Sequence, residues 1–315
     1  FRRFEELNIG YFFYIGGNDS MDTVSKLSRY AGFMNSSIRF IGVPKTIDND
    51  LVETDHTPGY GSAAKYVATT VREIAIDASV YDNKQSVTIV EIMGRHAGWL
   101  TAAGILARKY KGDNPRYIYL PESNFNTEDF LKDIEKALEK DCCVVVCVSE
   151  GIHDADGTFI CEYDSSVGTD TFGHKMLAGC GKYLENLVRE RLGVKARSVE
   201  LNVSQRCSAS LISAADQKEA VSAGRFGVQA ALDGITGKMV SFIRRTEADG
   251  TVRIECGLED VNAICNEEKT VPADWIINNG SDVSEKFLQY VLPLVQGRVE
   301  VPLGEDGLPV FVYRK

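Results

Sequence analysis

Short apolar runs alternate with amphipathic stretches along most of the chain. The apolar runs lie at residues 9–15, 38–43, 87–92, 117–120, 142–148 and 198–203, and their composition predicts strands. The amphipathic stretches between them, one ending near 31 and the others at 58–79, 97–110, 127–140, 175–192 and 214–232, predict helices. This alternation is typical of βα units, so the pattern predicts an α/β fold with a mainly parallel sheet.

Local signals refine two parts of this pattern. Thr57 and Pro58 open the long helix, with Thr57 as the predicted N-cap and Pro58 at the first helical position. Two alternating runs flank Ala248-Asp249-Gly250, which predicts a β-hairpin. From about residue 268 onward, the chain mixes short helical and extended pieces.

Four of the predicted strands end in segments rich in reactive side chains. These are GGNDS at 16–20, PKTIDND at 44–50, MGR at 93–95 and SEG at 149–151. Ligands of α/β proteins bind beyond the carboxyl ends of the strands. We therefore expect these segments to form the rim of a binding site.

The segment after the second strand carries Lys45, Asp48 and Asp50. In an extended backbone the two aspartates would point to the same side, because they are two residues apart. A lysine can neutralise a phosphate, one carboxylate can accept a hydroxyl proton, and the other can hold a metal ion, so the set suits phosphoryl transfer. The two carboxylates would repel each other unless a cation lies between them. The alternative interpretation is an ordinary polar loop after a strand.

Composition narrows the possible functions. The 315 residues can form two domains or one large one, and a net charge of −10 with a pI near 5.1 argues against nucleic acid or an anionic membrane as partner. The longest apolar run, 142–148, is too short to span a bilayer. The eight cysteines form no CxxC pair, which indicates a reducing, cytoplasmic compartment. No GxGxxG follows the first strand, so a dinucleotide-binding dehydrogenase is disfavoured.

Several segments together resemble the phosphofructokinase family. The similarity is carried by GGNDSMDT at 16–23, PKTIDND at 44–50, PGYGSAAK at 58–65, EIMGRHAGWL at 91–100, SEG at 149–151 and QR at 205–206. It covers nearly the whole chain, and PKTIDND combined with MGRHAGW is highly specific. The pyrophosphate-dependent branch is the closest match.

The resemblance implies a fold of two Rossmann-like three-layer α/β domains with the site in their cleft. One domain, for the phosphoryl donor, would combine residues 1–59 with 207–260. The other, for fructose 6-phosphate, would combine 60–206 with 261–315. The family's first glycine-rich phosphate loop would lie upstream of Phe1.

The resemblance also implies an activity and a set of site residues. A phosphoryl group would pass to the 1-hydroxyl of fructose 6-phosphate, with Mg²⁺ as cofactor, Asp48 as general base, and Arg95 and Lys45 facing the transition-state charge. Mg²⁺ would be held by Asp50 and, through a bound water, by Asn18. The sugar phosphate would be bound by Thr46, Ile47, Met93, Gly94, Glu150, Arg197, Val203, Gln205 and Arg206, with Arg206 on the 6-phosphate. Arg197 resembles an arginine that reaches a neighbouring subunit, which would require a homo-oligomer, either dimer or tetramer, with shared sites.

Two side chains bear on the phosphoryl donor, which would be bound by Gly16, Gly17, Asp19 and Lys45. Members of the family that use ATP usually carry glycine where this chain has Asp19 and Lys45. A carboxylate at Asp19 would repel a nucleotide's α-phosphate, whereas the Lys45 ammonium would attract pyrophosphate. We therefore predict pyrophosphate as the donor. The alternatives are an ATP-dependent 6-phosphofructokinase and a non-catalytic regulatory subunit of the same family.

Some polar residues near these motifs have simpler interpretations. His56 and His96 are expected to be loop or helix-start residues rather than catalysts. Arg244 and Arg245, beside the hairpin, are expected to form a solvated pair.

Overall fold

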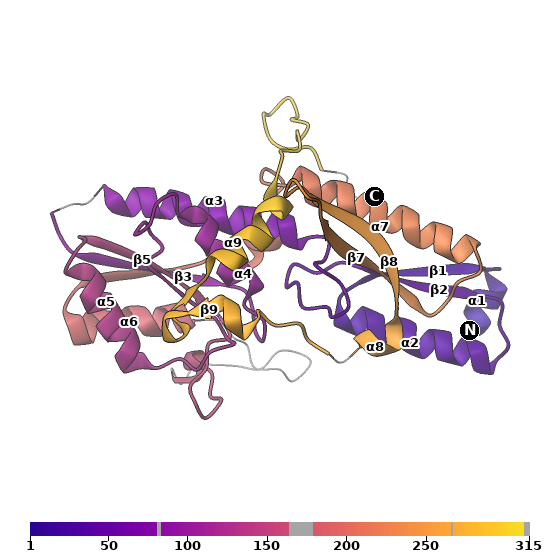
Figure 1. Cartoon of the computed structure of the whole chain (residues 1–315), viewed down its shortest axis with the longest axis horizontal. Helices are drawn as coiled ribbons and strands as arrows, with labels where there is room; N and C mark the ends of the chain where they lie inside the picture. The colour runs from indigo at the N-terminus through magenta and orange to yellow at the C-terminus, as the bar shows by residue number, and fades with distance from the viewer. Residues whose placement is uncertain (81–82, 164–178, 266, 312–315) are drawn as a thin grey trace. The chain divides into compact units, whose positions relative to one another are not determined.

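The computed structural model describes residues 1–80, 83–163, 179–265 and 267–311, and these divide into two compact units. Unit 1 comprises Phe1–Gly61 and Ala214–Lys269, and unit 2 comprises Ser62–Ser213 and Thr270–Lys315 (Figure 1). Each unit therefore combines segments that are distant in the sequence.

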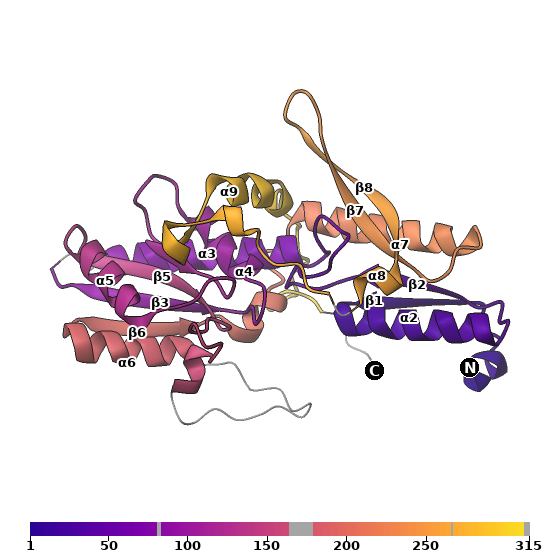
Figure 2. The same ribbon diagram turned by 60° about the horizontal axis from the view of Figure 1, so that its bottom comes forward.

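Unit 1 is built on a four-stranded sheet with the order β1-β2-β7-β8. Its elements are α1 (Arg2–Glu6), β1 (Tyr11–Gly16), α2 (Asn18–Phe33), β2 (Arg39–Pro44), α7 (Ala214–Leu232), β7 (Lys238–Thr246), β8 (Val252–Asp260) and α8 (Val261–Ile264). Strands β1, β2 and β7 run parallel, and β8 pairs antiparallel with β7 in the predicted hairpin. The long β7–β8 ribbon can be followed in Figure 2.

Helices cover both faces of this sheet. On one face, Met21 and Val24 of α2 pack with Phe40 and Met239 of the strands. On the other face, the residues of α7 pack against β2 and β7. Gly227 permits this close approach, because an added Cβ would lie 3.3–3.4 Å from side chains of both strands. Unit 1 therefore has three layers.

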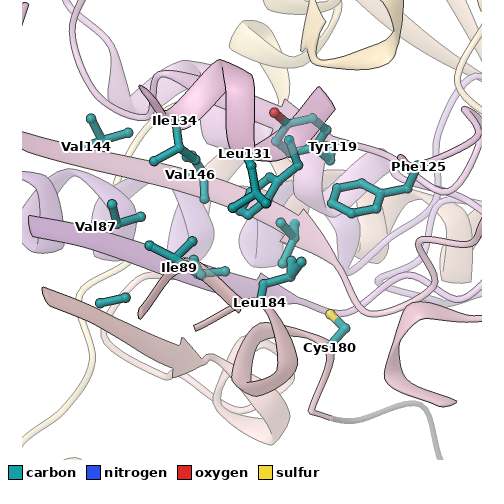
Figure 3. Packing of buried hydrophobic residues seen from close by; sticks show 14 of the residues in the cluster. Val87, Ile89, Tyr119, Phe125, Leu131, Ile134, Val144, Val146, Cys180 and Leu184 are labelled. Carbon is teal, nitrogen blue, oxygen red and sulfur yellow. The ribbon is translucent and has the colours of Figure 1, made fainter. Parts of the chain in front are cut away.

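Unit 2 is built on an entirely parallel sheet with the order β4-β5-β3-β6. Its main elements are α3 (Tyr60–Ser79), β3 (Ser86–Ile92), α4 (Trp99–Ala102), β4 (Tyr117–Tyr119), α5 (Thr127–Leu138), β5 (Cys143–Ser149), α6 (Cys180–Leu192), β6 (Lys195–Glu200), β9 (Ile276–Ile277), β10 (Asp282–Val283) and α9 (Glu285–Val291). Figure 3 shows the core beneath α5 and α6, where Leu131, Ile134 and Leu184 meet Val87 and Val146. The strands β3 and β5 are buried on both faces, which explains their continuous apolar sequence.

These observations confirm the predicted α/β class and hairpin, but the bounds of several predicted elements differ. The strand predicted at 198–203 is β6 (Lys195–Glu200), whose pairing with β3 ends at Glu200 opposite Glu91; residues 202–206 form a 3₁₀ helix. The helix predicted at 97–110 shortens to α4 and a 3₁₀ turn (Ala103–Ala107). There, the Asp113 carboxylate accepts the N–H groups of Lys109 and Tyr110 and forms a separate turn.

The helix predicted from Pro58 begins two residues later, at Tyr60. Thr57 is not the predicted N-cap, because its hydroxyl donates to the Thr46 carbonyl oxygen, 2.9 Å away. Residues 164–178, which include the start of the helix predicted at 175–192, lie outside the described residues. No helix in the described ranges is long and apolar enough to cross a bilayer.

Candidate active site

The carboxyl ends of β1 and β2 bring two predicted segments of unit 1 together. Gly16 at the end of β1 lies opposite Pro44 at the end of β2, so Asn18 and the 45–50 segment follow neighbouring strands. The Asn18 side-chain amide donates to Asp50, with 3.2 Å between Nδ2 and Oδ2. The two residues predicted to hold a metal ion are therefore in direct contact.

Thr46 forms hydrogen bonds with Asp48, the predicted general base. Its hydroxyl lies 3.1 Å from the Asp48 carboxylate oxygen Oδ2 and also accepts the Asp48 backbone N–H at 3.1 Å. Asn49 is fully buried in the left-handed region, with φ +57°, and accepts the N–H of Thr57. The extended backbone expected across Asp48–Asp50 is therefore wrong, and the turn at Asn49 instead sets the directions of the two carboxylates.

The Asn18–Asp50 pair has the character of a cation site. Asn18 Oδ1 and Asp50 Oδ1 are both buried and have no hydrogen-bond partner among the described residues. Burial and, secondarily, the charge of Asp48 raise the pKa of Asp50 to about 6. Unpartnered carboxylate and amide oxygens are the ligands that Mg²⁺ prefers, so the residues fit this ion. The described residues contain no cluster of three His, Cys, Asp or Glu that could hold a metal.

The predicted donor-binding residues lie around the same sheet edge. Gly16 leaves room for the Ser20 hydroxyl, because a Cβ on Gly16 would overlap Ser20 Oγ. Gly17 packs beside the Thr46 side chain, at 3.5 Å from an added Cβ. Asp19 and Lys45 are exposed, whereas Ile47 is half-buried.

In unit 2, the ends of β3, β5 and β6 converge on Met93 and Gly94. The Gln205 side chain accepts the Met93 N–H at 3.2 Å, and Glu150 accepts the Gly94 N–H at 3.4 Å. Gly94 has φ +149°, and a Cβ there would lie 2.6 Å from the Ala97 carbonyl oxygen, so only glycine fits. The sequence segments MGR, SEG and QR therefore form one cluster.

This cluster borders a pocket within unit 2. Its lining includes Glu91, Met93, Glu150, Glu200, Asn202 and Gln205. The glycine of SEG has a packing role, because a Cβ on Gly151 would overlap the Arg95 carbonyl oxygen. Carboxylates and amides are suited to bind hydroxyl groups.

The three arginines implied for phosphate binding occupy different surroundings. Arg95 is half-buried beside Gly151, and Arg206 is exposed at the end of the 3₁₀ helix that also carries the exposed Val203. Arg197 lies within the edge strand β6 opposite Thr88, and its guanidinium is 3.8 Å from Asp77. Arg197 is thus the one predicted residue of unit 2 that comes from the middle of a strand.

Sequence reasoning missed the tertiary contacts of two charged groups, the buried Glu91 and the half-buried Arg244. Glu91, only 4% exposed, accepts the N–H groups of Gly179 and Gly181 at the start of α6, and burial raises its pKa. A carboxylate inside the apolar run of β3 was a signal that could have identified it. The solvated pair predicted at Arg244 and Arg245 is wrong for Arg244, which binds both carboxylate oxygens of Asp55 at 2.9 Å.

Comparisons with known proteins agree with these motifs. The family model for phosphofructokinase matches residues 1–232. A pyrophosphate–fructose 6-phosphate 1-phosphotransferase of Xanthomonas campestris is 40% identical over 98% of this chain and 73% of the relative. A protein of the same name from Halomonas elongata is 39% identical over 97% of this chain and 72% of the relative.

A solved structure gives the same result for the fold. The crystal structure of a pyrophosphate-dependent phosphofructokinase from Marinobacter aquaeolei superposes with a TM-score of 0.87 at 34% identity, covering 100% of this chain and 76% of that one. The predicted fold class is confirmed by this likeness. Since the family model and relatives that span almost the whole chain agree, the chain belongs to the phosphofructokinase family.

Proposed function

We propose that the protein transfers a phosphoryl group from pyrophosphate to the 1-hydroxyl of fructose 6-phosphate, giving fructose 1,6-bisphosphate. The observation that carries this proposal is the 40% identity, over 98% of the chain, to a relative named for this reaction. The grouping of Asp48, Asp50 and Asn18 at one sheet edge supports it independently.

Unit 1 supplies the groups that act on the transferred phosphate. Asp48 accepts the proton of the sugar hydroxyl, and the Thr46 hydroxyl orients the Asp48 carboxylate for that task. Lys45 is exposed, so its ammonium is available to the negative oxygens of pyrophosphate. Asn18 and Asp50 would hold Mg²⁺, which when bound would neutralise charge on the pyrophosphate.

Unit 2 supplies the groups that bind the sugar phosphate. Glu150 accepts hydrogen bonds from sugar hydroxyls at the pocket beside Met93 and Gly94. Arg206 binds the 6-phosphate, since a planar guanidinium matches phosphate oxygens in a bidentate manner. Arg95 stabilises the charge that grows on the transferred phosphoryl group.

Arg197 has a separate role in this proposal. It is exposed on an edge strand, and its contact with Asp77 is long for an ion pair. We assign it to the site of a neighbouring subunit, so the active form is a homo-oligomer, a dimer or a tetramer.

The test offers pyrophosphate and ATP side by side to the purified protein with fructose 6-phosphate and Mg²⁺. Fructose 1,6-bisphosphate should form with pyrophosphate, and with ATP at less than about a hundredth of that rate. A protein that uses ATP and ignores pyrophosphate would overturn the donor assignment. A protein that uses neither would support the regulatory-subunit alternative.

A further inference from the structure

A buried histidine lies between two carboxylates in unit 1, and neither carboxylate belongs to the site residues assigned above. His56 is 1% exposed. Its Nδ1 lies 2.8 Å from Asp55 Oδ2, and its Nε2 lies 2.8 Å from Glu219 Oε2 of α7. Its ring also packs against Phe242 of β7, with 4.9 Å between the ring centroids.

The two carboxylates favour a charged ring. An ionised carboxylate can only accept hydrogen bonds, so with both carboxylates ionised each ring nitrogen donates and the imidazole carries a positive charge. The other ionisable groups nearby are Arg244, which binds Asp55, Lys269, which binds the Asp55 carbonyl oxygen, and Cys256 of β8, which interacts electrostatically with Glu219. Burial alone would lower the pKa of His56, but the two carboxylates raise this pKa above its usual 6.5.

Neighbouring hydrogen bonds hold the loop that carries Asp48 and Asp50 against β7 and the Lys269 backbone. The Thr54 hydroxyl accepts the Phe242 N–H at 2.8 Å, and Asp55 N–H donates to the Phe242 carbonyl oxygen at 2.9 Å. Next to them, the Lys269 backbone N–H donates to the Asp50 carbonyl oxygen at 2.7 Å. Two contacts join this end of the loop to α7: the His56 ring contacts Glu219, and the Gly59 N–H donates to Asp216 at 2.8 Å.

We propose that His56 is a positioning residue for phosphoryl transfer, which as an imidazolium joins residues 46–59 to α7 and β7 and so fixes the Asp48 and Asp50 carboxylates. Its ring contacts are Asp55, Glu219 and Phe242, and none of these residues is assigned to the substrate or the metal. This role rests on the proposed function, because it concerns the rate of that reaction. Small displacements of catalytic groups cost large factors in rate, so the contribution should appear mainly in kcat.

The first test compares His56→Gln and Glu219→Gln with His153→Gln. His153 is the control because it lies in unit 2, where its ring contacts the Asp154 carbonyl oxygen and Phe159. In the pyrophosphate assay, His56→Gln should lower kcat by roughly 10- to 100-fold. The KM for fructose 6-phosphate should change less than about threefold, because Glu150 and Arg206 belong to the other unit. The control should match the parent protein.

The pH profile separates positioning from simple loss of stability. In the parent, kcat should fall at alkaline pH as His56 loses its proton, and Glu219→Gln should move that fall to lower pH by about one unit. The sequence contains four histidines, so ¹³Cε1-labelled histidine NMR can follow the His56 titration directly. An unshifted alkaline limb in Glu219→Gln would overturn the proposal.

Hydrogen exchange tests the same role without activity. In His56→Gln, peptides from residues 46–59 should exchange at least about tenfold faster, while those from β3 and β5 stay unchanged. If the parent shows no activity with either donor, the proposed function fails. Hydrogen exchange of residues 46–59 in His56→Gln then decides whether His56 holds this loop in place. If the parent is active and His56→Gln keeps both parental kcat and parental exchange, the inference is wrong.

Discussion

The Asn18 amide donates a hydrogen bond to the Asp50 carboxylate at 3.2 Å, which leaves one buried, unpartnered oxygen on each side chain among the described residues. This arrangement is unfavourable without a cation. Burial and the charge of Asp48 raise the pKa of Asp50 to about 6, so ionised Asp50 destabilises the metal-free fold. A bound cation would compensate both the charge and the missing hydrogen bonds.

Asp50→Asn should therefore separate metal binding from stability. We expect the Mg²⁺ concentration for half-maximal activity to rise at least about tenfold. The metal-free variant should be at least as stable as the parent at pH 7, because the folded parent then carries a carboxylate whose raised pKa favours the protonated form. Urea unfolding and Mg²⁺ titration measure the two effects. Asp22→Asn, which alters an exposed ion pair with Lys26 on α2, is the control and should change neither.

The Thr46–Asp48 contact predicts a graded effect on the chemical step. Asp48→Asn should lower kcat by roughly 10²- to 10⁴-fold, the usual contribution of a general base. Thr46→Val removes the hydroxyl that bonds the Asp48 carboxylate and backbone N–H, and should lower kcat by about tenfold. Thr46→Ser keeps the hydroxyl and should stay within about threefold of the parent. Equal rates for the valine and serine variants would show that this hydrogen bond has no role.

The sequence predicted these contacts only in part. Strand ends could be read from apolar runs, and parallel order then placed the 16–20 segment beside the 45–50 segment. The left-handed turn at Asn49 was not predictable from spacing, because it depends on a hydrogen bond to Thr57. The direction of each carboxylate follows from that turn.

Long-range pairs were beyond sequence reasoning for a different reason. In the sequence, Arg244 looks like an ordinary strand residue and His56 like an ordinary loop residue. No local pattern marks Asp55 or Glu219 as their partners. Only the packing of α7 and β7 against the loop brings these four charged groups together. Tertiary contacts of this kind leave no local pattern.

The assignment of pyrophosphate as donor predicts that a substitution at the exposed Asp19 changes the specificity for the phosphoryl donor. Asp19→Gly should allow measurable phosphorylation of fructose 6-phosphate by ATP, because it removes a carboxylate that would repel the nucleotide's α-phosphate. The ratio of kcat/KM for ATP to that for pyrophosphate should rise at least about tenfold. Asp22→Asn again serves as a control on the same helix. An unchanged ratio would mean that Asp19 does not select the donor.

The assignment of Arg197 to a neighbouring subunit predicts complementation. Arg197→Ala and Asp48→Ser should each be nearly inactive alone. If both are mixed, dissociated and reassembled, some sites combine an intact Asp48 with an intact Arg197, and up to about a quarter of parental activity should return, the statistical share expected if two copies mix freely. Mixtures that remain inactive, although sedimentation shows mixed oligomers, would place Arg197 in its own subunit's site or outside the site.

Glu122 gives a pH-dependent prediction for unit 2. Its Oε1 accepts the N–H groups of Gly98 and Val271, both at 2.8 Å, whereas Oε2 is buried with no partner among the described residues. Burial raises the pKa of Glu122 above its ordinary 4.5. The folded state therefore holds this proton to higher pH than the unfolded state does, and stability declines as pH rises between the two pKa values.

Glu122→Gln removes this titration while keeping an acceptor oxygen for both N–H groups. Its free energy of unfolding, relative to the parent, should therefore increase as pH rises from about 4.5 towards neutrality. Glu122→Ala also leaves both N–H groups without an acceptor, so it should be about 1–3 kcal/mol less stable than Glu122→Gln at every pH. Glu128→Gln is the control with the opposite sign. Arg191 lowers the pKa of Glu128, so the stability of this variant relative to the parent should decrease as pH rises towards about 4.5 and then stay constant. Urea unfolding on both sides of pH 4.5 measures all three variants, and parallel profiles for Glu122→Gln and the parent would show that Glu122 keeps an ordinary pKa.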